Sequence, residues 1–300
     1  MTNLFRRTGP RPLIYGHRGA RAVLPENTMA GFDYLREIGA DGVELDIQNA
    51  RGGVPVIVHD PHIPMQIARD ESGAWLRDPG PLVSSLDLAA LQRYDVGRLN
   101  PDHAYAARYP AQQPVDGARI PTLAAFLDWA ATQPALQVNI EIKSHAARSD
   151  LGDPPDALVA ALLDALASHD IADRCLISSF DWRVLRILRD AAPALARGYL
   201  AYEPQGEDCT IYEGSPWMDG RSLAAFGGSM PHLLAAEGAA CWCAWQDDLT
   251  AERVALARDL GLAVIVWTVN HPDRMAEMIA MGVDGIITDD PARALEVARQ

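Results

Sequence analysis

Carboxylates alternate with apolar residues in two strand-like segments of this chain. Glu44 and Asp46 lie two positions apart in one segment, and Glu141 and Lys143 repeat the pattern in the other. Because side chains alternate across a β-strand, Glu44 and Asp46 point to the same face, opposite their apolar neighbours. Buried carboxylates repel one another, and a cation bound between them removes that cost. The pattern therefore predicts a metal site formed by Glu44, Asp46 and Glu141.

The ligands of this predicted site are all oxygen atoms. Such sites favour Mg²⁺, Ca²⁺ or Mn²⁺ over zinc. We expect one divalent cation, Mg²⁺ or Ca²⁺, with Mn²⁺ as an alternative. A purely structural interpretation also stays open, in which these groups form buried ion pairs, for instance Glu141 with Lys143.

Two histidines, His17 and His59, each follow a short apolar run. Imidazole titrates near neutral pH, so one ring can take a proton while the other gives one. If the two runs are strands that reach the same end of the fold, the rings form a natural pair for proton transfer.

Arg18 and Lys143 are candidates for binding an anion. The planar guanidinium of Arg18 suits phosphate oxygens, and Lys143 offers a point charge for the same anion. The alternative for Arg18 is a salt bridge to Glu26 or Asp46.

Strand-like and helix-like segments alternate almost to the end of the chain, which is typical of a parallel barrel or a doubly wound sheet. The expected strands are 13–16, 42–47, 54–58, 137–142, 175–178, 196–201, 239–243, 262–268 and 284–288. The expected helices are 28–38, 123–131, 155–168, 182–191, 251–260 and 272–281.

The linker between the second and third strands is too short for a parallel crossover, which needs about a dozen residues. We therefore expect 54–58 to return antiparallel as a hairpin arm. The remaining eight strands predict an α/β fold, a (β/α)8 TIM barrel in which residues 1–300 form a single domain.

Residues 60–119 do not follow the alternation of strand-like and helix-like segments, and they are rich in Pro, Gly, Asp and Arg. So long a connection in a compact domain is normally a lid or a small subdomain. Because it follows His59 directly, we expect a lid-like insertion over the barrel mouth. The irregular stretch 202–230 is a second candidate for a rim loop.

Taken together, these motifs resemble the glycerophosphodiester phosphodiesterase family. The resemblance rests on the motifs His17-Arg18-Gly19-Ala20, Pro25-Glu26-Asn27-Thr28, Glu44-x-Asp46, His59-Asp60, Glu141-x-Lys143, Ser178-Ser179-Phe180, Trp267-Thr268-Val269-Asn270 and Ile287-Thr288-Asp289. They follow one another in the order of the family and cover nearly the whole chain.

The resemblance implies a metal-dependent hydrolysis of glycerophosphodiesters to sn-glycerol 3-phosphate and an alcohol. It implies that His17 and His59 are the catalytic pair, and we interpret His17 as the base and His59 as the acid. Trp267, at the end of a strand, would form an apolar wall for glycerol carbons, unless it only packs within the barrel.

Other functions compatible with these residues are a lysophospholipase D-like or cyclising phosphodiesterase and a non-catalytic barrel that binds a phosphorylated ligand. A Schiff-base role for Lys143 is disfavoured, because three neighbouring carboxylates would keep its ammonium charged.

The composition limits the partners. The chain has 300 residues and a formal net charge of −14, which argues against nucleic acid and against stable association with anionic membranes. The four cysteines form no recognised metal or redox motif, and we expect reduced thiols. The segment before residue 12 has no apolar core typical of a signal peptide, so the expected location is the cytoplasm. The expected partner is a small phosphodiester, and the oligomeric state stays open.

Overall fold

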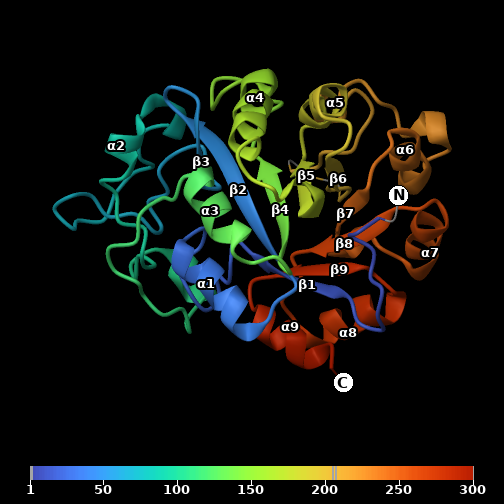
Figure 1. Cartoon of the computed structure of the whole chain (residues 1–300), viewed down its shortest axis with the longest axis horizontal. Coiled ribbons are helices and arrows are strands. Elements are labelled where there is room, and N and C mark those ends of the chain that lie inside the picture. Colours follow the sequence, from blue (N-terminus) through green and yellow to red (C-terminus); the bar gives the residue numbers. More distant parts are fainter. Residues whose placement is uncertain (1–2, 205, 207, 300) are drawn as a thin grey trace.

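The computed structural model describes residues 3–204, 206 and 208–299 of the chain. Its strands are β1 (Leu13–His17), β2 (Gly42–Ala50), β3 (Val54–Ile57), β4 (Gln137–Ile142), β5 (Cys175–Ser179), β6 (Ala196–Ala201), β7 (Cys241–Trp245), β8 (Ala263–Trp267) and β9 (Gly285–Thr288). Eight of them are parallel and close into a barrel, because β1 pairs with both β9 and β2 (Figure 1). β3 pairs antiparallel with β2 as a hairpin arm. The predicted TIM barrel and its arm are thus confirmed.

The helices surround the barrel (Figure 1). They are α1 (Met29–Ile38), α2 (Leu88–Leu91), α3 (Leu123–Ala131), α4 (Pro155–Leu166), α5 (Trp182–Ala191), α6 (Met230–Ala236), α7 (Ala251–Asp259), α8 (Pro272–Met281) and α9 (Pro291–Val297). Helix α1 begins after Thr28, whose hydroxyl accepts from the Gly31 N–H, and ends at Gly39 in the left-handed region. Helix α6, which follows the irregular stretch after β6, and helix α9 were not predicted from the sequence.

Apolar side chains fill the amino-terminal end of the barrel. Tyr15 is fully buried there, and a side-chain carbon at Gly42 would clash with its ring. Gly42 therefore has no room for a larger residue. The Tyr15 hydroxyl is hydrogen-bonded to Gln137. With this end packed, open space in the barrel is left at the carboxyl ends of the strands, where active sites of this fold are built.

The insertion 60–119 has an apolar cluster of its own, which packs on the β3 arm. Val56 and Val58 of the arm contact Ile63, Val83 and other buried residues of the insertion. In Figure 1 the insertion forms the loops around α2, beside β2 and β3. The arm thus anchors the insertion next to the barrel mouth.

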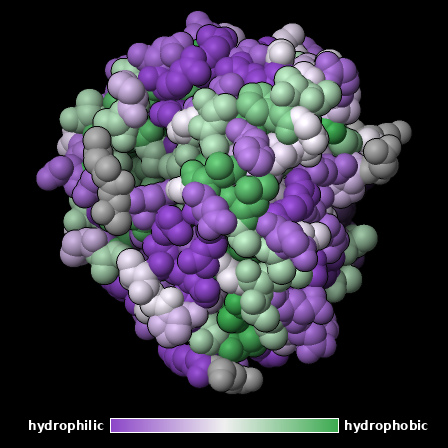
Figure 2. Space-filling view, turned by 90° about the vertical axis from the view of Figure 1, so that its right-hand side faces the viewer, coloured by the Kyte–Doolittle hydropathy of each residue, from purple (hydrophilic) through white to green (hydrophobic). Residues whose placement is uncertain are grey.

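The surface carries few large hydrophobic side chains. In Figure 2, hydrophilic residues surround small hydrophobic areas on the face that is shown. Among the described residues, the exposed large hydrophobic side chains are Leu4, Tyr212 and Leu260. No helix in the described part of the chain is long and apolar enough to span a bilayer.

Candidate active site

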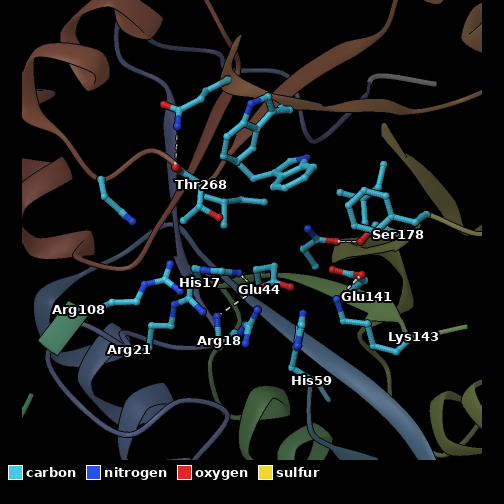
Figure 3. A pocket seen from close by; sticks show the side chains of 18 of the residues that line it. His17, Arg18, Arg21, Glu44, His59, Arg108, Glu141, Lys143, Ser178 and Thr268 are labelled. Carbon is cyan, nitrogen blue, oxygen red and sulfur yellow. Dashed lines mark hydrogen bonds and ion pairs between the residues drawn. The ribbon is translucent and has the colours of Figure 1, made fainter. Parts of the chain in front are cut away.

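A cavity of about 540 Å³ opens at the carboxyl ends of the barrel strands (Figure 3). His17 and Trp267 end β1 and β8 at its edge, and Lys143 borders it directly after β4. All eight predicted site residues lie in or beside this cavity; seven line it, and Asp46 lies beneath them against Lys143. Residues from almost the whole length of the chain therefore meet at one place.

Strand register explains why the three predicted metal ligands meet. Asp46 lies directly opposite Glu141 in the parallel pair of β2 and β4, and His17 lies opposite Glu44 in the pair of β1 and β2. One carboxylate oxygen from each of Glu44, Asp46 and Glu141 lies within 4.8 Å of the other two. All three carboxylates are buried.

The charges of this cluster are only partly balanced by side chains. Lys143 Nζ lies 2.5 Å from a Glu141 oxygen and 3.0 Å from an Asp46 oxygen. Burial, followed by the charges of Asp46 and Glu141, raises the pKa of Glu44 well above its ordinary value. Burial also raises the pKa of Asp46, but Lys143 and other cations outweigh it and hold this pKa well below its ordinary value.

Among the residues that the structure describes, no Lys or Arg side chain forms an ion pair with Glu44. Its Oε2 accepts the backbone N–H of Arg18 at 3.0 Å, and the nearest ring nitrogen of His17 lies 3.9 Å away. A buried carboxylate beside two others, with no side-chain cation in contact, fits a site that holds a divalent ion. Asn27 donates to Asp46 Oδ2 at 3.0 Å, while its neighbour Thr28 caps helix α1.

His17 is held by a carboxylate that the sequence analysis gave no role. The Nδ1 atom of His17 lies 2.6 Å from Asp289 Oδ1. Gly16 pairs with Thr288 in the contact of β1 and β9, so barrel closure places the following residues, His17 and Asp289, side by side. Burial and the neighbouring Arg21 lower the pKa of His17 to about 4. The ring is therefore neutral at neutral pH, with Nε2 as its open nitrogen.

Asp289 is itself tightly bound. Besides His17, its oxygens accept hydrogen bonds from Arg21, Asn270 and Tyr109, at 2.6, 2.7 and 3.2 Å. Burial opposes ionisation, but His17 and Arg21 outweigh it and lower the pKa of Asp289. The carboxylate thus stays ionised and fixed in place.

His59 reaches the cavity by a different route. Strand β2 pairs with β4 as far as Ile47 and then continues to Ala50. Strand β3 runs back along this extension, and after it the Val58 N–H donates to the Asp46 carbonyl. His59 therefore directly follows the returning arm, which is antiparallel to β2 as predicted. Its Nδ1 lies 2.7 Å from Asp60 Oδ1, while Gln66 donates to the other Asp60 oxygen.

Burial, with the nearby Arg18 and Lys143, lowers the pKa of His59 to about 4. Both histidines thus have the same construction, in which a carboxylate binds Nδ1. Because a hydrogen bond at one ring nitrogen sets which nitrogen carries the proton, each carboxylate selects the form in which Nε2 is free to react.

Arg18 makes the salt bridges considered in the alternative interpretation. Its Nη1 lies 2.9 Å from Glu26 Oε1, and its Nε lies 3.4 Å from Asp46 Oδ2. It also lines the cavity, at a left-handed turn with φ of 53°. Arg18 and Lys143 are therefore held in place by carboxylates while they line the cavity.

Trp267 belongs to an aromatic wall. Its ring centroid lies 5.3 Å from that of Phe180 and 5.1 Å from that of Trp245, and its Nε1 donates to the Cys243 carbonyl at 2.9 Å. Trp245 was not predicted as a site residue, because the strand was expected at 239–243, two residues before the observed β7. Phe180 was seen only as part of a motif.

Two cationic side chains of the cavity, those of Arg21 and Arg108, were not predicted from the sequence. Arg21 and Arg108 line the cavity on the side of His17 (Figure 3). Arg21 donates to Asp289 and to the Tyr105 hydroxyl. Arg108 comes from the insertion, where no periodic pattern marks a functional side chain.

Comparisons of the sequence and of the structure with known proteins all find the same family. The sequence model of the glycerophosphoryl diester phosphodiesterase family matches residues 17–293. A glycerophosphodiester phosphodiesterase of Caldanaerobacter subterraneus is 29% identical over 290 residues, covering 97% of this chain and 99% of the relative. A crystal structure from Silicibacter pomeroyi described by the same family name has a TM-score of 0.88 at 33% identity, covering 98% of this chain and 95% of its own.

A phosphodiesterase of Oleispira antarctica, solved in complex with the product sn-glycerol-3-phosphate, shares the fold. Its TM-score is 0.71 at 22% identity, and the match covers 97% of this chain and 98% of that one.

Proposed function

The chain belongs to the glycerophosphoryl diester phosphodiesterase family and is an enzyme of that class, and we propose that it hydrolyses glycerophosphodiesters to sn-glycerol 3-phosphate and an alcohol with one divalent cation and two histidines. The observation that carries this proposal is the placing of His17 and His59, each held at Nδ1 by a carboxylate, around one cavity with the three-carboxylate cluster.

Glu44, Asp46 and Glu141 would hold the cation, which is Mg²⁺ or Ca²⁺ by the hardness of the ligands, with Mn²⁺ as an alternative. When bound, this ion supplies charge neutralisation at the phosphate and lowers the pKa of the attacking water. Asn27 holds Asp46 in position through its amide. Glu44 supports this assignment. Asp46 and Glu141 form ion pairs with Lys143, whereas the described side chains give Glu44 no such ion pair, so a bound cation would stabilise its charge most.

In this proposal His17 is the general base. Its Nε2 accepts the proton of the attacking water, and Asp289 stabilises the imidazolium that results. His59 is the general acid, which gives its Nε2 proton to the oxygen of the leaving alcohol. The anionic phosphodiester favours the protonated form of a ring beside it and so opposes the low pKa of the free protein. Arg18 and Lys143 bind the phosphate oxygens.

The aromatic wall around Trp267 would pack against the glycerol carbons. The insertion would act as a lid, since Tyr105 and Tyr109 connect it to Glu26 and Asp289 at the barrel mouth. The four cysteines are unpaired, which suits the cytoplasm as the proposed location.

A panel of phosphodiesters tests the substrate class. Glycerophosphocholine, glycerophosphoethanolamine and glycerophosphoglycerol are incubated with the enzyme, and release of sn-glycerol 3-phosphate is followed in a coupled assay. We expect turnover of these compounds. If lysophosphatidylcholine were the only substrate, the lysophospholipase D-like alternative would replace the proposal, while turnover of none would refute it.

A further inference from the structure

We propose that the alcohol half of the substrate occupies a side pocket next to His59, and that Trp217 makes this pocket selective for an alcohol with a methylated end group, such as the quaternary ammonium of choline. This inference rests on the proposed function, because it assigns a preference within the same reaction. The side pocket has a volume of about 190 Å³. It adjoins the main cavity at four residues that line both, namely His59, Glu141, Lys143 and Phe180.

The place of the side pocket fits the side of the phosphate on which the alcohol leaves. Its lining includes His59, the proposed acid, but not His17, the proposed base. In the main cavity His59 lies on the side of Lys143, whereas His17 lies on the side of Arg21 and Arg108 (Figure 3). In an in-line displacement at phosphorus, the attacking water and the leaving oxygen stand on opposite sides. The alcohol half therefore belongs on the side of His59, where the side pocket lies.

A second pocket beside His59 is too small for an alcohol. Its volume is about 10 Å³, roughly the space of one water molecule. Asp60, which binds Nδ1 of His59, lines this small pocket and neither of the two larger ones. Because the proposed place of the glycerol half is the aromatic wall around Trp267, the side pocket is the space left for the alcohol.

The surface that the side pocket offers to a ligand is largely apolar. Trp217 and Phe180 are only partly buried, so their rings can contact a ligand, and Pro61 adds apolar surface. Trp217 comes from the loop between β6 and α6, part of the stretch 202–230 that we interpreted as a rim loop. Such a surface stabilises methyl groups, and aromatic faces also attract the charge of a quaternary ammonium group.

Polar side chains of the side pocket are already bound to other protein groups. Lys143 Nζ forms ion pairs with Glu141 and Asp46. The Ser144 hydroxyl donates to Asp181 Oδ2 at 2.6 Å. These groups therefore have little hydrogen-bonding capacity left for a ligand.

His145 is the remaining polar residue of the lining. Burial and the charge of Lys143 lower the pKa of His145, so its ring is neutral at neutral pH and does not repel a cation. Its Nε2 atom is buried. The pocket thus offers few free side-chain acceptors. A primary ammonium would lose hydrogen bonds to water there without replacing them, whereas a quaternary ammonium has no N–H group to satisfy.

Two substrates that differ only in methylation test the inference. Glycerophosphocholine and glycerophosphoethanolamine each carry one positive charge on the alcohol and differ by three methyl groups. The ratio of their kcat/KM values is measured for the wild type, for Trp217→Ala and for Trp217→Phe, which retains an aromatic ring. Tyr212→Ala is the matched control, because Tyr212 is an exposed aromatic residue of the same loop that lines neither the main cavity nor the side pocket.

We expect the wild type to favour glycerophosphocholine by about tenfold, Trp217→Ala to lose most of this preference, and Trp217→Phe and Tyr212→Ala to keep most of it. A wild type without the preference would overturn the inference, and so would an unchanged ratio in Trp217→Ala. Loss of the preference in Tyr212→Ala would assign it to the loop as a whole and would also overturn the inference. Failure of the wild type to hydrolyse any glycerophosphodiester would refute the proposed function instead. Melting temperatures show whether each variant is folded, and the wild-type ratio tests the inference even if a variant is not.

Discussion

Asp289 Oδ1 lies 2.6 Å from Nδ1 of His17, although 272 residues separate them in the chain. The contact exists because β1 closes the barrel against β9. A buried carboxylate at this position fixes the orientation of the ring and stabilises its protonated form. Asp289 is thus a positioning residue for the proposed base, and it acts through His17.

Replacing Asp289 by Asn should slow the reaction with little effect on substrate binding. The amide cannot stabilise the imidazolium, and it can favour the wrong ring nitrogen for the proton. We expect kcat to fall by about 10²-fold or more at similar KM. Steady-state kinetics checks this result. If activity followed the loss of folded protein in thermal melts, Asp289 would have a structural role only.

The two histidines should respond differently to the leaving group. Removal of either ring should lower turnover of a natural diester by about 10²–10⁴-fold. Glycerophospho-p-nitrophenol needs little protonation as it leaves, so it should restore the rate of His59→Ala but not of His17→Ala. Initial rates with both substrates decide the matter, and equal rescue of the two variants would contradict divided roles.

Glu44→Gln should lose metal binding and turnover but gain stability without metal. The wild-type carboxylate is repelled by Asp46 and Glu141, which contributes to its raised pKa. Removing its charge should therefore raise the melting temperature in chelator by about 2 °C or more. Differential scanning calorimetry and Mn²⁺ titration give the two readouts. A lower melting temperature would mean that Glu44 is balanced by the protein alone.

Acid should weaken the metal-free protein over a defined pH range. The pKa of His17 and of His59 is about 4 in the folded state, against about 6.5 in an unfolded chain. The unfolded state therefore binds more protons between these values, and the free energy of unfolding falls as the pH drops from 6.5 to 4. Urea unfolding in chelator should show this fall, and His17→Gln should reduce it. The same slope in both proteins would disprove the assignment to His17.

The residues of β2 and β4 show how much of the site could be predicted. Alternation of carboxylates with apolar residues fixed the inward face of Glu44, Asp46 and Glu141, and parallel pairing then set them side by side. The barrel followed from the eight parallel segments and was confirmed.

Other parts of the site depend on long-range packing that no local pattern reports. Asp289 was part of a recognised motif, but only barrel closure brings it to His17. Trp245 was missed because the apolar run allowed a strand that began two residues too early. Arg108 lies in an irregular insertion whose path depends on packing against the β3 arm. The short helix α6 was not predicted either; it begins where the stretch 202–230, interpreted as a rim loop, ends.

A ³¹P NMR time course with glycerophosphoethanolamine tests the central claim most directly. The enzyme is first treated with chelator, and Mg²⁺, Ca²⁺ or Mn²⁺ is then added in separate samples. We predict no product with chelator and, after addition of at least one of these ions, the signal of sn-glycerol 3-phosphate without a cyclic phosphate intermediate. Full turnover in excess chelator, or release of ethanolamine phosphate instead of sn-glycerol 3-phosphate, would contradict a metal-supported hydrolysis by this site.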